Sequence, residues 1–96
     1  MPEQEIAFAL VLVTLREGQT ALADALEVLK AHEPEMATLH HLLEAARELA
    51  DQAQALVLLM KESRADKASL ADADDLTSFF WTTEESIEAK IGLGRG

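Results

Sequence analysis

Residues 6–15 read Ile-Ala-Phe-Ala-Leu-Val-Leu-Val-Thr-Leu, and this uncharged stretch decides how the chain must fold. As a helix it carries apolar side chains on every face for nearly three turns. A helix that is apolar all round has to be covered all round. The rest of the chain offers only one other long amphipathic segment and a small tail. The sequence therefore predicts a protein completed by contact with a second chain, either its own copy or another protein.

A strand is the alternative for the same stretch, because Ile6, Val11, Val13 and Thr14 are β-branched. A lone strand has nothing to pair with, and the one other strand-like segment, residues 56–60, lies inside a helical pattern. Apolar residues make up 49% of the 96 residues, against 4 glycines and 2 prolines. This composition favours helix, so the predicted fold is all-α.

Proline 34 divides residues 1–64 into two helical arms, at about 3–32 and 34–64. Because the connection is short, the arms are expected to form an antiparallel hairpin. Each arm has apolar positions in alternating steps of three and four, which is the spacing of a packing seam. The first seam contains Phe8, Leu12, Leu15, Gln19, Leu22, Leu26 and Leu29.

The second arm has two adjacent seams, which predict contact with two neighbouring helices. Together they contain Met36, Leu39, Leu42, Leu43, Ala46, Leu49, Ala50, Ala53, Leu56, Val57 and Met60. Glycine 18, in the middle of the first arm, costs roughly 1 kcal/mol relative to alanine. It indicates close packing, a kink or a break, and the sequence leaves these three open.

Residues 65–96 form a second unit, in which aspartates and serines interrupt the apolar pattern. We expect an acidic loop, a helical turn near Asp75–Phe80, a short helix over 83–91 ended by Gly92, and a frayed end. The pairs Ser69 with Asp72 and Thr82 with Glu85 resemble capping boxes.

Three of the four aromatic residues, Phe79, Phe80 and Trp81, are consecutive in this unit. Three consecutive side chains cannot all point the same way, so at least one is expected to face outward. The cluster is either a plug over the open end of the hairpin or an anchor that enters a partner's groove. The predicted partner-binding residues are Phe79, Phe80, Trp81, Asp74, Asp75, Glu84 and Glu85.

Catalytic and metal-binding patterns are weak. The histidines at 32, 40 and 41 lie near Glu33, Glu44 and Glu48, but no Glu-x-x-His pair of a di-iron bundle occurs, and His40 and His41 diverge by about 100° on a helix. No cysteine is present, all serines follow position 62, and no phosphate-binding loop occurs. We expect no enzyme activity and no cofactor, with a metal-binding bundle as the remote alternative.

The formal charge of −10, from 18 acidic and 8 basic residues, opposes binding to nucleic acid or to anionic lipid. The carboxylates are too scattered for an ordered imitation of DNA. The N-terminus carries Glu3 and Glu5 where a signal peptide has basic residues, and ten apolar positions are about half of a membrane span. A cytoplasmic location without membrane contact is therefore expected.

The favoured hypothesis is a homodimer of two hairpins packed as a four-helix bundle. Its expected dimer interface contains Ile6, Phe8, Leu10, Val11 and Val13. Its function would be to bind and inhibit or sequester another protein that has a basic or apolar groove. The alternative is a secretion chaperone or antitoxin that buries its N-terminal helix against a cognate protein.

The hairpin layout resembles small bacterial antiactivators of transcription factors and type III secretion chaperones in shape, without residue correspondence. Secreted hairpins with a Trp-x-Gly bend are contradicted, because Trp81 lies far from the bend and Thr82 follows it.

Overall fold

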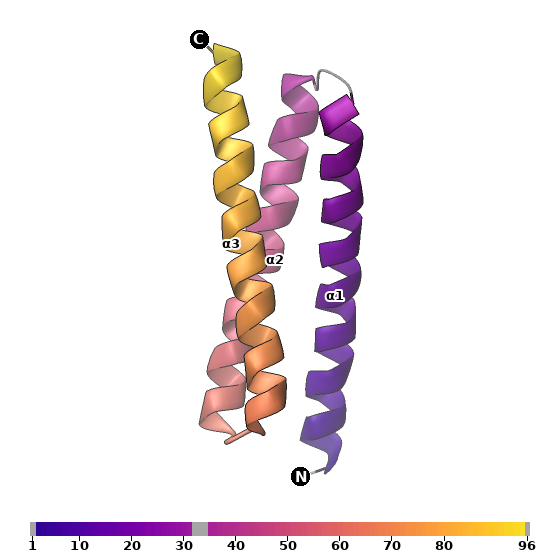
Figure 1. Ribbon diagram of the computed structural model, residues 1–96. Helices are drawn as coiled ribbons and strands as arrows, with labels where there is room; N and C mark the ends of the chain where they lie inside the picture. Colours follow the sequence, from indigo (N-terminus) through magenta and orange to yellow (C-terminus); the bar gives the residue numbers. More distant parts are fainter. Residues whose placement is uncertain (1, 32–34, 96) are drawn as a thin grey trace.

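Three long helices make up the computed structural model, which describes residues 2–31 and 35–95 (Figure 1). Helix α1 spans Pro2–Ala31, α2 spans Met36–Glu62 and α3 spans Lys67–Arg95. They run up, down and up along one axis, in a rod of 51 × 19 × 18 Å. The all-α prediction is confirmed, and the described ranges contain no strand. The predicted helix end at His32 and the bend at Pro34 lie outside these ranges.

The seams predicted for the first two helices form the buried core. In α1 the side chains of Leu12, Leu15 and Leu22 are buried, and Phe8, Leu26 and Leu29 pack against them. In α2 the buried residues are Leu39, Leu43, Ala46, Ala50, Ala53, Leu56, Val57 and Met60. This wide stripe contacts both other helices, as its two adjacent seams predict. The packing of α2 on α3 is the most extensive, and α1 makes smaller contacts with each.

The prediction of a loop with short helical pieces over residues 65–96 is wrong, because α3 is one helix of 29 residues. It continues through Gly92, where the prediction ended it. Its buried side chains follow seam spacing: Ala73, Leu76, Thr77, Phe80, Thr83, Ile87 and Ile91. The hydroxyl of Thr77 donates a hydrogen bond of 2.8 Å to the carbonyl oxygen of Ala73, so it is buried without an unmet polar group. Because alanine and threonine occupy several seam positions of α3, the amphipathic pattern of this helix is weak in the sequence.

The presence of α3 changes how the core closes. It covers the second seam of α2, the part that the predicted four-helix bundle left to a second hairpin. The core of the described residues is thus completed within one chain. A second copy is not needed to bury the stripe of α2.

The turn between α2 and α3 is a Schellman motif that reverses the chain in a few residues. The backbone N–H of Ala65 bonds to the carbonyl oxygen of Met60 at 2.9 Å, and that of Arg64 bonds to Lys61 at 3.3 Å. Arg64 has a φ of 56°, in the left-handed region that usually requires glycine. Two residues further on, Asp66 caps α3.

Asp66 caps α3 by accepting the backbone N–H of Ser69 at 3.2 Å. Hydrogen bonds from the hydroxyl and from the backbone N–H of Ser69 lower the pKa of the Asp66 carboxyl below its ordinary value of 3.8. The capping pair is therefore Asp66 with Ser69, three positions earlier than the Ser69–Asp72 spacing that the sequence suggested.

Besides its buried leucines, α1 makes three further contacts with the rest of the bundle. Near its start, the amide of Gln4 donates to the hydroxyl of Ser63 at 2.7 Å. Arg16 forms an ion pair of 2.7 Å with Asp72 of α3. Midway along α1, a Cβ on Gly18 would lie 2.8 Å from a methyl group of Leu49 in α2. The glycine therefore marks a close approach of α1 to α2, the first of the three possibilities.

The approach at Gly18 predicts that the effect of Gly18→Ala depends on Leu49. With Leu49 replaced by Ala, Gly18→Ala should stabilise the protein by about 1 kcal/mol, the ordinary helix-propensity gain. With Leu49 present, the new methyl group displaces the leucine, so the gain should be reduced or lost. Urea denaturation of the four members of this cycle measures the difference. An equal gain in both backgrounds would show that Leu49 does not restrict the side chain at position 18.

The cap of α3 predicts a pH-dependent stability. Because the folded-state pKa of Asp66 is lowered, its ionised form adds stability above about pH 3.8, and this contribution is lost as the pH falls through the lowered value. Asp66→Ala should lower the melting temperature at pH 7, with a smaller difference from wild type in strong acid. Melting curves by circular dichroism at several pH values measure this. A difference that does not change with pH would contradict the cap.

Candidate functional site

The three consecutive aromatic residues of α3 have three different environments. Phe80 is fully buried in the core, and Phe79 is half-buried, packed against that core. Their rings meet edge to face, with centroids 5.7 Å apart. Trp81 points outward and is 47% exposed. One aromatic of the cluster does face outward, as expected, whereas Phe80 offers no side-chain surface to a partner and is corrected to a core residue.

Trp81 lies beside a shallow hollow between α2 and α3, which we call the Trp81 groove. Its volume is about 200 Å³. The lining residues are Gln54, Val57, Leu58 and Lys61 from α2, with Asp74, Thr77, Ser78 and Trp81 from α3. Leu58 is 56% exposed, so the groove joins two large exposed apolar side chains. The sequence interpretation missed Leu58. A signal for it exists, because Leu58 belongs to the apolar run 56–60 but to neither seam of α2, which indicates an exposed apolar side chain.

The acidic residues predicted for the contact divide into two groups. Asp74, Asp75 and Glu85 are exposed and take part in no ion pair among the described residues. Glu84 instead binds Arg47 of α2 at 3.0 Å, and so does Glu88, which was not among the predicted residues, at 2.8 Å.

The double ion pair of Arg47 braces α2 against α3. Its hydrogen bonds to Glu84 and then Glu88 raise the pKa of the Arg47 guanidinium above its ordinary value. The charge of Glu84 is thus balanced within the chain. Of the three predicted carboxylates without an ion pair in the described ranges, Asp74 lines the Trp81 groove, and Asp75 and Glu85 lie on the same helix.

A second apolar surface lies on α1, where the expected dimer-interface residues are found. Ile6, Leu10, Val11 and Val13 are exposed, while Phe8 is half-buried against the core and belongs to it. The stretch Glu3–Lys30 is long and apolar enough to cross a membrane by length and composition, with a mean hydropathy of 1.4. Core helices of soluble proteins and signal sequences meet the same criterion.

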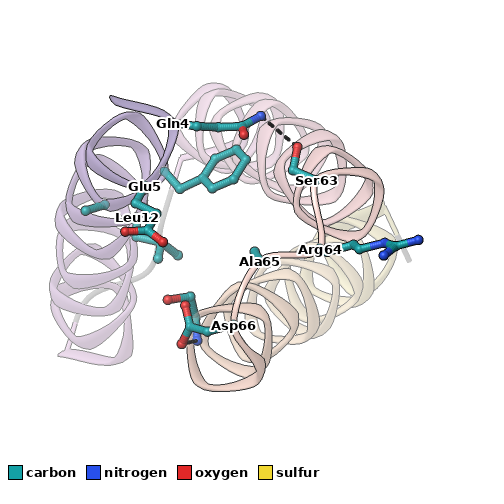
Figure 2. A pocket seen from close by; sticks show the side chains of 10 residues that line it. Gln4, Glu5, Leu12, Ser63, Arg64, Ala65 and Asp66 are labelled. Carbon is teal, nitrogen blue, oxygen red and sulfur yellow. Dashed lines mark hydrogen bonds between the residues drawn. The ribbon is translucent and has the colours of Figure 1, made fainter. Parts of the chain in front are cut away.

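A larger hollow, of about 480 Å³, lies at the end of the bundle where α1 begins and α2 turns into α3 (Figure 2). Its apolar lining residues are Phe8, Ala9, Leu12 and Ala65, and Arg64 points away from it. Four of its polar residues bind one another in pairs: the amide of Gln4 donates to the hydroxyl of Ser63, and the backbone N–H of Ser69 donates to Asp66. The first of these bonds joins the start of α1 to the end of α2, and the second caps α3.

The histidines contribute no metal site in the described ranges. His40 lines a hollow with Arg47 and Glu88, and both His40 and His41 are exposed. No group of three or more potential ligands is found among the residues that the structure describes. His32 and Glu33 of the predicted cluster lie outside those residues.

The different burial of Phe80 and Trp81 predicts different effects of their replacement. Phe80→Ala removes a fully buried ring and should cost about 3–5 kcal/mol of unfolding free energy. Trp81→Ala should cost less than about 1 kcal/mol, because half of the side chain already contacts water. Urea denaturation followed by circular dichroism measures both. A large loss for Trp81→Ala would identify Trp81 as a core plug.

Comparison with family models, with curated proteins and with solved structures gave no match for this chain. The function therefore has to be inferred from the chain's own residues.

Proposed function

We propose that this chain is a non-enzymatic protein-binding module, a small acidic regulator that binds and inhibits or sequesters another protein through the Trp81 groove. The observation that supports this most directly is the pairing of Trp81 with Leu58 on the surface. Both side chains are large, apolar and about half exposed, and they come from different helices. Tryptophan is among the residues most enriched at the energetic centres of protein interfaces.

The groove is held in place before any partner arrives. Trp81 follows directly on Phe80, whose side chain is buried in the core, and the Arg47 ion pairs join α2 to α3 outside the groove. Binding to a surface that is already ordered loses less conformational entropy. A shallow groove between two helices suits the apolar side of a third helix.

Charge favours a basic partner. Asp74 lines the groove, Asp75 and Glu85 lie on the same helix, and Lys61 is the one basic residue that lines it. The net charge of −10 adds a long-range attraction to positive surfaces. Electrostatic attraction would speed encounter, and the two apolar side chains would prolong the complex. We therefore propose a helical segment with one apolar side and flanking lysines or arginines as the ligand.

The single tryptophan of the chain gives a direct test, since its fluorescence reports on the groove. A synthetic amphipathic helix of leucine and lysine should shift the Trp81 emission to shorter wavelength and bind less tightly as salt is added. A matched peptide of leucine and glutamate should not bind. A scrambled leucine–lysine peptide with no apolar side should bind at least tenfold more weakly.

Neighbouring leucines provide the control for the site. Leu58→Ala should weaken binding of the leucine–lysine peptide about tenfold or more, as expected for a residue at the centre of an interface. Leu59→Ala should leave it unchanged, because Leu59 is 53% exposed but does not line the groove. Equal effects of the two substitutions would show that the peptide binds elsewhere, and the proposal for the groove would fail.

A further inference from the structure

The Trp81 groove has one charged end and one uncharged end. Because α2 and α3 run in opposite directions (Figure 1), Lys61 and Asp74 line the end of the groove near the turn between these helices. Gln54 and Trp81 line the other end. On each helix the two ends are seven residues apart, which corresponds to about 10 Å. A ligand that lies along the groove therefore meets charge at one end only.

The charged end also has two different walls. Lys61 comes from α2 and Asp74 from α3, so a positive and a negative side chain line the groove from opposite sides. Both are exposed, and neither takes part in an ion pair among the residues that the structure describes. The dipole of α2 favours a basic residue in its last turn, but it does not account for an aspartate inside α3. Both charges are available to a ligand.

We propose that Lys61 and Asp74 fix the direction in which a helical ligand lies in the Trp81 groove. This inference rests on the proposed function and specifies the chemistry of its ligand. The apolar side of the ligand helix is flanked by an acidic residue, which pairs with Lys61, and by a basic residue on the other flank, which pairs with Asp74. Its apolar side chains cover Leu58 and Trp81.

The direction follows from the geometry of the ligand helix. The residues directly before and after an apolar residue lie about 100° to either side of it, so they are on opposite flanks of the apolar side. Turning the helix end to end in the groove exchanges these two flanks. A given order of acidic and basic residue therefore matches both walls in one direction only. In the other direction the acidic residue meets Asp74 and the basic residue meets Lys61.

The two local charges are sufficient to select a direction. An exposed ion pair changes an equilibrium constant by up to about fivefold, so two pairs together favour one direction by about tenfold. The net charge of −10 attracts a basic ligand at long range in either direction, so it contributes to affinity but not to this preference. Added salt should reduce the preference by screening both pairs.

Two peptides of identical composition test the direction. Each is an amphipathic helix of leucine and lysine with a single glutamate, directly before the central leucine in one peptide and directly after it in the other. A nitroxide at the N-terminus of the peptide broadens the NMR signals of nearby amides of the protein. One peptide should broaden signals at the Lys61 end of the groove, and the other should broaden signals at the Trp81 end. Broadening at the same end by both peptides would overturn the inference.

A charge exchange on the protein gives the second test. Lys61→Glu combined with Asp74→Lys exchanges the charges of the two walls and leaves the net charge at −10. Each peptide should then bind in the direction opposite to that in wild type, with about the same affinity. Lys67→Glu combined with Asp75→Lys is the matched control, because these exposed residues of α3 do not line the groove. It should keep the directions of wild type.

Failure of this inference is distinct from failure of the proposed function. If neither peptide shifts the Trp81 emission, the groove does not bind a helix and both proposals fail. If both peptides shift the emission but the exchange of Lys61 and Asp74 leaves their directions unchanged, only the role of these two residues is overturned. Melting curves by circular dichroism establish that both double variants are folded.

Discussion

The packing of α2 against two neighbours is the constraint on which the rest of the structure depends. Its buried stripe is too wide for one helix to cover, and alanines at 46, 50 and 53 allow close approach on both sides. Helix α3 takes the larger share of this surface and α1 the smaller. Once α2 and α3 are paired, one face of α1 is enough to cover the apolar surface that they leave exposed. The opposite face of α1 remains in contact with water. The exposed apolar face of α1 thus follows from how α2 is covered.

Much of this arrangement is visible in the sequence, because leucine seams with steps of three and four are strong signals. The buried faces of α1 and α2 follow from such seams, and so does the double contact of α2. The third helix was concealed because its seam uses Ala73, Thr77 and Thr83 where α1 uses leucine. Its start was concealed as well, since the capping residue is Asp66, whereas the sequence suggested Ser69.

The candidate surfaces could be predicted in part. The crowding of Phe79, Phe80 and Trp81 indicates that one of them must face outward, but only the phase of α3 decides that it is Trp81. The contribution of Leu58 depends on how α2 and α3 are aligned, a long-range property that no local pattern contains. The sequence also predicts that Ile6, Phe8, Leu10, Val11 and Val13 are covered by another chain. In the structure Phe8 packs against the core, whereas the other four side chains are exposed.

The left-handed conformation of Arg64 has a consequence for engineering. Side chains other than glycine and asparagine are strained at a φ of 56°, by roughly 1–2 kcal/mol. Replacing Arg64 by glycine would release this strain without changing the core, the Trp81 groove or the exposed apolar side chains of α1. A variant stabilised in this way would remain folded after destabilising substitutions elsewhere. Substitutions in the Trp81 groove could then be tested for loss of binding without unfolding the protein.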